Sequence, residues 1–86
     1  MRTHHIKLQE EFCDAVLQGE KTFEIRYNDR AYQKGDHIVF NPVGKSLPII
    51  HEIEYREYEI TYVLSGWGIK ENYVVFSIKE VEKGGM

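Results

Sequence analysis

The residue types best suited to binding a ligand gather in one short segment, residues 19–26, which reads GEKTFEIR. Within it, Lys21 precedes an alternating stretch that places Glu24 and Arg26 on the same side of an extended chain. An arginine fork suits a phosphate or a planar base edge, a lysine supplies a point charge, and a glutamate accepts a hydrogen bond from an exocyclic amine. This combination predicts a site for a nucleotide.

The same spacing has two other interpretations. On a solvated strand face, Glu24 and Arg26 would pair with each other or with a neighbouring strand, and periodicity alone favours this interpretation. Alternatively, a desolvated Lys21 that loses its proton would serve as a base or a nucleophile. A carboxylate beside the amine keeps it charged, so Glu24 favours binding over proton abstraction.

Several other kinds of site are excluded by what the chain lacks. It has one cysteine, Cys13, and its four histidines include only one close pair, the adjacent His4 and His5, so no zinc-binding spacing occurs. It also has no phosphate-binding loop, no dinucleotide-binding glycine turn and no nucleophile elbow. We therefore expect neither a metal nor a cofactor.

The elements that must position these residues are mainly strands. Apolar residues at helical spacing predict one main helix over residues 9–18, which Gly19 ends. Alternation predicts strands over residues 4–8, 22–27, 36–43 and 73–81, the last with Val74, Phe76 and Ile78 facing inward. Five or six strands with one helix predict an α+β, mainly β fold, a partly closed barrel.

The region 49–64 alternates as well, but its apolar positions change parity within it. Ile53 and Tyr55 are odd-numbered, whereas the later apolar residues are even-numbered: Tyr58, Ile60, Tyr62 and Leu64. We therefore expect two strand segments with a break at residues 56–57. Residues 65–72 form a loop, in which Trp67 is either a base-stacking platform or a hydrophobic plug, and the plug is the commoner role.

Composition limits the setting. The 86 residues suit one domain, 1–86, and the aromatic share of 13% favours strands. A single cysteine and no long apolar run predict a cytoplasmic protein without a signal peptide or membrane span, and no oligomeric state is indicated. The net charge of −3 argues against non-specific attraction to phosphate, although residues 21–34 hold four basic and two acidic side chains.

The charged segment also resembles a known family. The residues Gly19, Lys21, Glu24 and Arg26 reproduce the G-x-K-x-x-E-x-R signature of ASCH domains, which resemble PUA domains in fold. Similar stretches at residues 4–7, 12–19, 23–30, 34–36, 60–64 and 68–75 resemble a small bacterial and phage ASCH-like family of unknown function, DUF3850, over nearly the whole chain. Residues 41–56 depart from it, because they lack the longer acidic hairpin usual there.

The resemblance implies a PUA-like pseudo-barrel that binds RNA or a nucleotide in a cleft between helix and barrel. Lys21, Glu24 and Arg26 would line the cleft, and the supporting residues would be Lys7, Arg30 and His4. On this basis we expect an RNA- or nucleotide-binding module that recognises single-stranded RNA or a modified nucleoside.

Two alternatives remain open. Some small bacterial relatives look like amidohydrolases that remove an acyl group from the exocyclic amine of cytidine with a Lys, a Thr and a later Glu. Lys21 matches their Lys, Glu24 stands at the place of their Thr, and Glu71 is the candidate for the later Glu. The other alternative is a protein-interaction domain of a transcription or translation regulator, whose acidic segment 51–59 would meet a basic partner.

Overall fold

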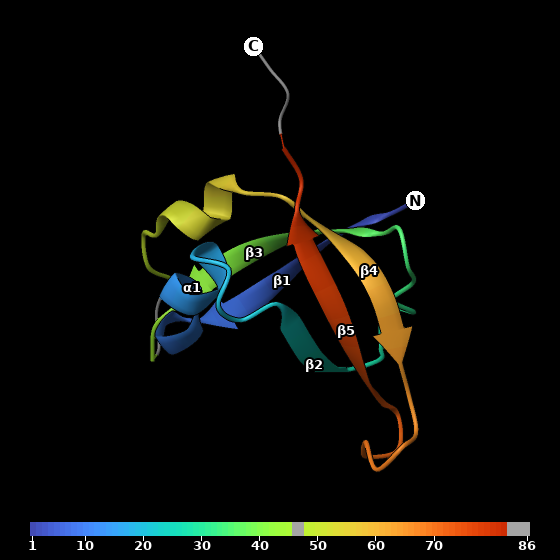
Figure 1. The fold of residues 1–86 in the computed structure, drawn as a ribbon. Coiled ribbons are helices and arrows are strands. Elements are labelled where there is room, and N and C mark those ends of the chain that lie inside the picture. Colours follow the sequence, from blue (N-terminus) through green and yellow to red (C-terminus); the bar gives the residue numbers. More distant parts are fainter. Residues whose placement is uncertain (46–47, 83–86) are drawn as a thin grey trace.

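The computed structural model describes residues 1–45 and 48–82. In this part of the chain the elements are, in order, β1 (Thr3–Gln9), α1 (Glu10–Leu17), β2 (Phe23–Tyr27), β3 (His37–Val43), the 3-10 helix η1 (Glu52–Tyr55), β4 (Tyr58–Leu64) and β5 (Tyr73–Glu80). The five strands form one sheet in the order β1-β3-β4-β5-β2, in which β1 pairs parallel with β3 and the other pairs are antiparallel. Figure 1 shows the sheet curling into a half-barrel, so the fold is α+β and mainly β, as predicted.

The helix α1 forms where the sequence predicts it. Glu10 and Glu11 lie in its first turn, where negative charge opposes the positive end of the helix dipole. Gly19 follows with a φ of +78°, a left-handed conformation that ends the helix at low cost. Its inward side buries Cys13 and Val16, while Phe12 stays 39% exposed. Among the described residues, no helix is long and apolar enough to cross a membrane.

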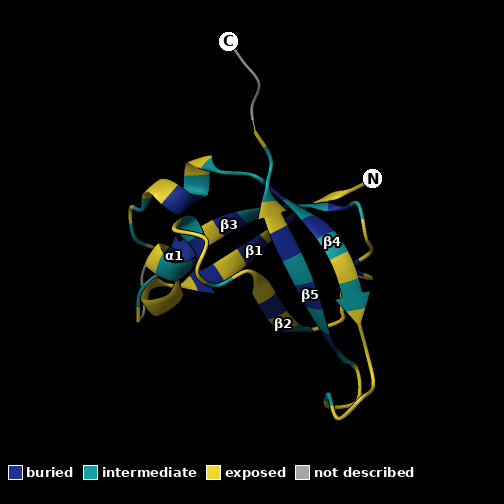
Figure 2. Ribbon diagram, viewed as in Figure 1, coloured by how far each residue is buried: buried dark blue, intermediate teal, exposed yellow. Residues whose placement is uncertain are grey.

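The core lies inside the curl of the sheet. Ile38 and Phe40 of β3 and Ile60 of β4 are fully buried, and Phe76 of β5 is 1% exposed. Figure 2 shows the buried positions alternating along the strands, as a one-sided sheet requires. Residues 74, 76 and 78 face inward, which confirms the prediction for the last strand.

Residues 49–55 do not form the predicted strand. Ile53 is fully buried, but it lies in the 3-10 helix η1, which His51 begins by accepting a hydrogen bond from the Ile53 N–H at its Nδ1 atom (3.0 Å). Two odd-numbered apolar residues are too short a pattern to distinguish a strand from such a turn. The predicted break at residues 56–57 is confirmed, since β4 begins at Tyr58.

Alternation in β4 is interrupted by a register shift between Ile60 and Tyr62. The bulge inserts Thr61, so the residues after it point to the opposite face of the sheet. Tyr58 and Ile60 are buried, whereas Tyr62, which shares their even parity, is 63% exposed and Val63 packs against the core instead. Trp67 is not the expected plug either, because it is 90% exposed in the loop before β5.

Candidate functional site

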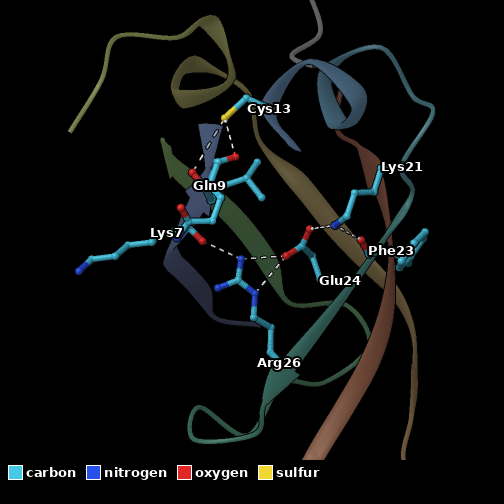
Figure 3. A network of polar contacts seen from close by, with 8 residues as sticks. Lys7, Gln9, Cys13, Lys21, Phe23, Glu24 and Arg26 are labelled. Atoms are coloured by element: carbon cyan, nitrogen blue, oxygen red, sulfur yellow. Dashed lines mark hydrogen bonds and ion pairs between the residues drawn. The ribbon is translucent and has the colours of Figure 1, made fainter. Parts of the chain in front are cut away.

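The two edge strands of the curled sheet, β1 and β2, approach each other without pairing through their backbones. A side chain bridges the seam between them: Arg26 Nη2 on β2 donates to the Lys7 carbonyl oxygen on β1 at 2.6 Å. Figure 3 shows the Lys7 side chain pointing away from this contact, so Lys7 contributes its carbonyl rather than its amine. The predicted site therefore lies where the barrel is left open.

Glu24 is the centre of the polar network in the seam (Figure 3). Its side chain is only 4% exposed, and its Oε1 atom accepts hydrogen bonds from Arg26 Nε at 3.0 Å and Nη2 at 2.8 Å. Its Oε2 atom accepts from Lys21 Nζ at 2.5 Å. One buried carboxylate thus joins two cations, which compensates for the cost of removing it from water.

This burial corrects the expectation of a solvated strand face. Glu24 and Arg26 do pair with each other, but the charged side of β2 points into the molecule and the apolar side points out. Phe23, Ile25 and Tyr27 are 49%, 57% and 54% exposed. Alternation alone separates the two sides of a strand without saying which side is buried.

The amine of Lys21 is held by negative and π-rich groups on several sides. Besides Glu24, its Nζ atom donates to the Phe23 carbonyl oxygen at 2.8 Å. The same atom lies 5.2 Å from the ring centroid of Phe12 and 5.0 Å from that of Phe23. These contacts hold the Lys21 amine in place at the seam as a hydrogen-bond donor and as a partner for the two rings.

A pocket of about 290 Å³ opens beside this network. Its volume is at the lower limit of the ~300–1,000 Å³ typical of small-molecule sites, which suits a ligand of nucleoside size. The wall combines the charged residues with apolar ones, and its members are Lys7, Leu8, Gln9, Phe12, Lys21, Phe23, Glu24, Ile25 and Arg26. We call it the seam pocket.

The backbone of β2 adds polar groups to the seam pocket. Ile78 N donates to the Thr22 carbonyl and Asn28 N to the Asn72 carbonyl, both at 2.9 Å. Hydrogen-bonded pairs alternate in an antiparallel ladder, so the even-numbered residues of β2 bond to β5. Ile25 therefore turns its N–H and C=O toward the open edge. A planar ligand entering there meets a backbone donor and acceptor beside the charges.

His4, predicted to support the site, lies outside the seam pocket. It is buried elsewhere, where its Nε2 atom bonds Asp36 at 2.8 Å and its ring contacts Tyr32 edge to face. Burial opposes ionisation of Asp36, but hydrogen bonds from His4 and from the Arg2 and Gln33 N–H groups outweigh it and hold the pKa of Asp36 below its usual value. Even-numbered residues of β1 point into the core, so His4 is buried on the same side of the strand as Ile6 and Leu8.

Arg30 and Glu71 are also separated from the seam pocket. Arg30 lies in the exposed turn after β2, where its carbonyl oxygen accepts a hydrogen bond from Arg2. Glu71 lines a different pocket, of about 510 Å³, beside the Tyr27 end of β2. Lys21 precedes the other end of that strand, and the four residue steps between the ends span about 14 Å. Lys21 and Glu71 are therefore not neighbours.

The apolar wall of the seam pocket was not predicted as part of the site. Phe12 comes from α1 and Phe23 from β2, and both rings face the Lys21 ammonium. The helical spacing that places Phe12 on an apolar stripe does not distinguish a core residue from one at the rim of a pocket. The position of Phe23 directly beside Glu24 in the sequence is a signal that could have identified Phe23 as part of the site.

The acidic segment 51–59 is partly neutralised within the molecule. Arg56 forms ion pairs with Glu52 and, at 2.8 Å, with Glu80, and His37 bonds Glu57. These contacts use much of the charge that a basic partner would need.

The fold and the site together define a small α+β half-barrel with a charged, nucleoside-sized pocket between its edge strands. The chain belongs to the family described as a domain of unknown function, DUF3850, whose sequence pattern matches residues 3–78.

Similar proteins include a phage protein and a protein of known structure. An uncharacterized 12.9 kDa protein of Escherichia phage P2 is 32% identical over 74 residues, which is 86% of this chain and 65% of the phage protein, so the chain spans about two thirds of that relative. The crystal structure of the hypothetical protein PH0355 superposes with a TM-score of 0.61 at 18% identity, covering 94% of this chain and 100% of the other. That likeness concerns the fold alone.

Proposed function

We propose that the chain is an ASCH-type, PUA-like module that binds RNA or a nucleotide, and that the seam pocket holds one nucleotide of the ligand. The observation that carries this proposal is the buried Glu24 carboxylate held between Lys21 and Arg26. A purely structural ion pair would not require a pocket of nucleoside size beside it. A role in RNA recognition implies a cytoplasmic protein.

The charge of the network supports an anionic ligand. One carboxylate faces two cations, so the three side chains leave an excess of one positive charge. The side chains of Lys21 and Arg26 keep 19% and 25% of their surface exposed, while Glu24 is almost covered. Among the described residues, Arg26 Nη1 has no hydrogen-bond partner, so it is available to donate to a phosphate.

The remaining groups suit a base. The Phe12 and Phe23 rings offer apolar surface for stacking, and the open edge of β2 offers the Ile25 N–H and C=O. Glu24 would accept from an exocyclic amine if the ligand displaced one of its cations. Phosphate and base contacts thus lie within one pocket, which is the combination that a nucleotide requires.

The same geometry favours binding over hydrolysis. The Lys21 amine donates to the Glu24 carboxylate and to the Phe23 carbonyl oxygen, so it is engaged as a hydrogen-bond donor rather than free to attack an amide. Glu71, the candidate for the second catalytic residue, lines the other pocket.

Calorimetric titration with cytidine monophosphate tests the proposal. We expect Arg26→Gln to weaken binding by about ten- to a hundredfold, because one charge-assisted hydrogen bond contributes ~1.5–3 kcal/mol. The matched control is Arg30→Gln, an exposed arginine outside the pocket, which should change affinity less than about twofold. Lys21→Arg should retain most of the binding. Equal loss in both arginine variants would contradict a site at the seam.

A parallel incubation with N4-acetylcytidine separates binding from catalysis. Chromatography would follow the release of cytidine by the native protein and by Lys21→Ala. We expect no release above the background without protein. Release that depends on Lys21 would replace the binding proposal with an amidohydrolase.

A further inference from the structure

A band of aromatic and aliphatic side chains covers the outer face of β2, β5 and β4. The strand register places Phe23 beside Ser77 and Tyr62, Ile25 beside Val75 and Leu64, and Tyr27 beside Tyr73, and residues directly opposite each other share a face. We call this the outer aromatic face, with members Phe23, Ile25, Tyr27, Tyr62, Leu64, Tyr73 and Val75. Figure 2 shows exposed and partly exposed positions along these strands.

The outer aromatic face is unusually exposed for its composition. Ile25 is 57% and Tyr27 54% exposed, and Tyr62, on β4 at the same face, is 63% exposed. Single exposed apolar residues need no explanation, but a contiguous band of them marks an interaction surface. The bulge in β4 contributes to it directly, since it turns Tyr62 and Leu64 outward.

The loop 65–72 continues the face at the Tyr27 end. It holds two non-glycine residues in the left-handed conformation, Trp67 at a φ of +54° and Asn72 at +70°. A bulky residue in that region carries a local energetic cost, and such costs concentrate at functional positions. The Trp67 side chain is 90% exposed, so packing within the described fold does not offset the cost of its backbone conformation.

The outer aromatic face connects two pockets. Phe23 and Ile25 also line the seam pocket, while Tyr27 and Tyr73 line the 510 Å³ pocket under the loop. Each pocket is lined by cationic side chains: the seam pocket by Lys21 and Arg26, and the other pocket by Lys70 beside Glu71, with the Lys70 Nζ atom 5.4 Å from the Tyr73 ring centroid. The two ends of β2 are about 14 Å apart.

We propose that the outer aromatic face carries the nucleotides that flank the one in the seam pocket, so that the ligand is a single-stranded polynucleotide of several residues rather than a free nucleotide. This inference rests on the proposed function and specifies its ligand. Bases stack on tyrosine and phenylalanine whatever their sequence, and the cationic side chains that line the two pockets meet the phosphates. Continuity with the seam pocket through Phe23 and Ile25, together with these cations, favours this occupant over a second copy of the chain.

The test compares cytidine monophosphate with a cytidine oligoribonucleotide of about eight residues. We expect the oligonucleotide to bind at least tenfold more tightly to the native protein. The double variant Tyr27→Ala/Tyr73→Ala should lose at least tenfold in oligonucleotide affinity while its affinity for the mononucleotide stays within about twofold, since a stacked base contributes ~1–3 kcal/mol. The matched control is Tyr55→Ala, a 71% exposed tyrosine of η1 away from the face, which should change neither affinity.

Trp67 provides a local reporter, because it is the single tryptophan of the chain. Its fluorescence should be quenched by the oligonucleotide and much less by the mononucleotide. Far-ultraviolet circular dichroism of the double variant confirms that it folds.

The outcomes are distinguishable. A mononucleotide that binds in an Arg26-dependent way, with no gain for the oligonucleotide, overturns this inference and leaves the seam pocket standing. If neither ligand binds, both proposals fail. Sedimentation that shows a dimer of the native protein, lost in the double variant, assigns the outer aromatic face to a second copy and also overturns the inference.

Discussion

Replacing Glu24 with glutamine tests whether the buried carboxylate holds the seam together. Glutamine keeps the size of the side chain but removes its charge, and one of its two terminal groups becomes a donor. The native carboxylate accepts three hydrogen bonds, two from Arg26 and one from Lys21. In the variant at least one cation faces an N–H group instead of an oxygen, so it loses its partner.

The structure sets the size of the effect. Removing one partner of a fully buried ion pair costs about 3–5 kcal/mol, because the other charge stays buried and unpaired. Here Lys21 and Arg26 keep 19% and 25% of their side-chain surface exposed, so both can turn partly toward water. We therefore expect Glu24→Gln to lower the free energy of unfolding by about 2 kcal/mol. For a domain of this size that corresponds to a fall in Tm of roughly 8–16 °C.

Urea and thermal unfolding followed by circular dichroism measure the change. The matched control is Glu20→Gln, an exposed glutamate of the same segment, which should stay within about 0.5 kcal/mol of the native protein. A double-mutant cycle with Arg26→Gln should show that the second substitution costs less once Glu24 is gone. The reasoning is refuted if Glu24→Gln unfolds like its control.

Three further outcomes follow from groups outside the seam. Burial, and to a lesser extent the charge of Glu80, raises the pKa of Tyr58 to about 12, and its hydroxyl has no hydrogen-bond partner among the described residues. In urea unfolding, the Tyr58→Phe variant should therefore be as stable as the native protein or up to ~1 kcal/mol more stable. As the pH rises from about 10 to 12, the variant should lose less stability than the native protein. A variant that is more than ~1 kcal/mol less stable at pH 7 would reveal a missed hydrogen bond of the Tyr58 hydroxyl. Asp36→Asn should cost about 1–3 kcal/mol at pH 7. Because folding lowers the pKa of Asp36, its contribution is fully present above the ordinary value and disappears as the pH falls through the folded value. The urea midpoints of variant and native protein should therefore converge in acid, below that ordinary value; a constant difference would argue against the His4 contact. Trp67→Ala should leave Tm almost unchanged, whereas a buried plug would cost several kcal/mol.

Long periodic segments of the fold could be predicted from the sequence, and short ones could not. The helix and the last strand each combine a repeated apolar spacing with a clear stop, so α1 and β5 lie where they were expected. In β4, one inserted residue, Thr61, reverses the parity that the pattern appeared to continue. The sequence carries no local signal for the 3-10 turn around Ile53 or for this bulge that would outweigh the alternating pattern typical of a regular strand.

The side chains of the candidate site could be predicted from the sequence, but their burial and their position between β1 and β2 could not. The spacing correctly puts Glu24 and Arg26 on one side of β2, and the structure adds Lys21 to them. The burial of that side depends on the curl that brings β1 opposite β2, which is a long-range property of the sheet. For the same reason sequence reasoning included His4 and Arg30, which the topology directs elsewhere.

Because the pocket lies in the open seam, binding of a ligand there is thermodynamically coupled to the folding of the chain. A barrel that closed β1 against β2 by backbone hydrogen bonds would remove the pocket. In the described part of the chain these two edge strands do not pair with each other, so a ligand can join them. A molecule bound across that gap contacts only the folded state and must raise its stability, by about 2.7 kcal/mol at a hundred times its Kd. Unfolding curves recorded with a collection of nucleotides would therefore rank ligands without any prior assay of function.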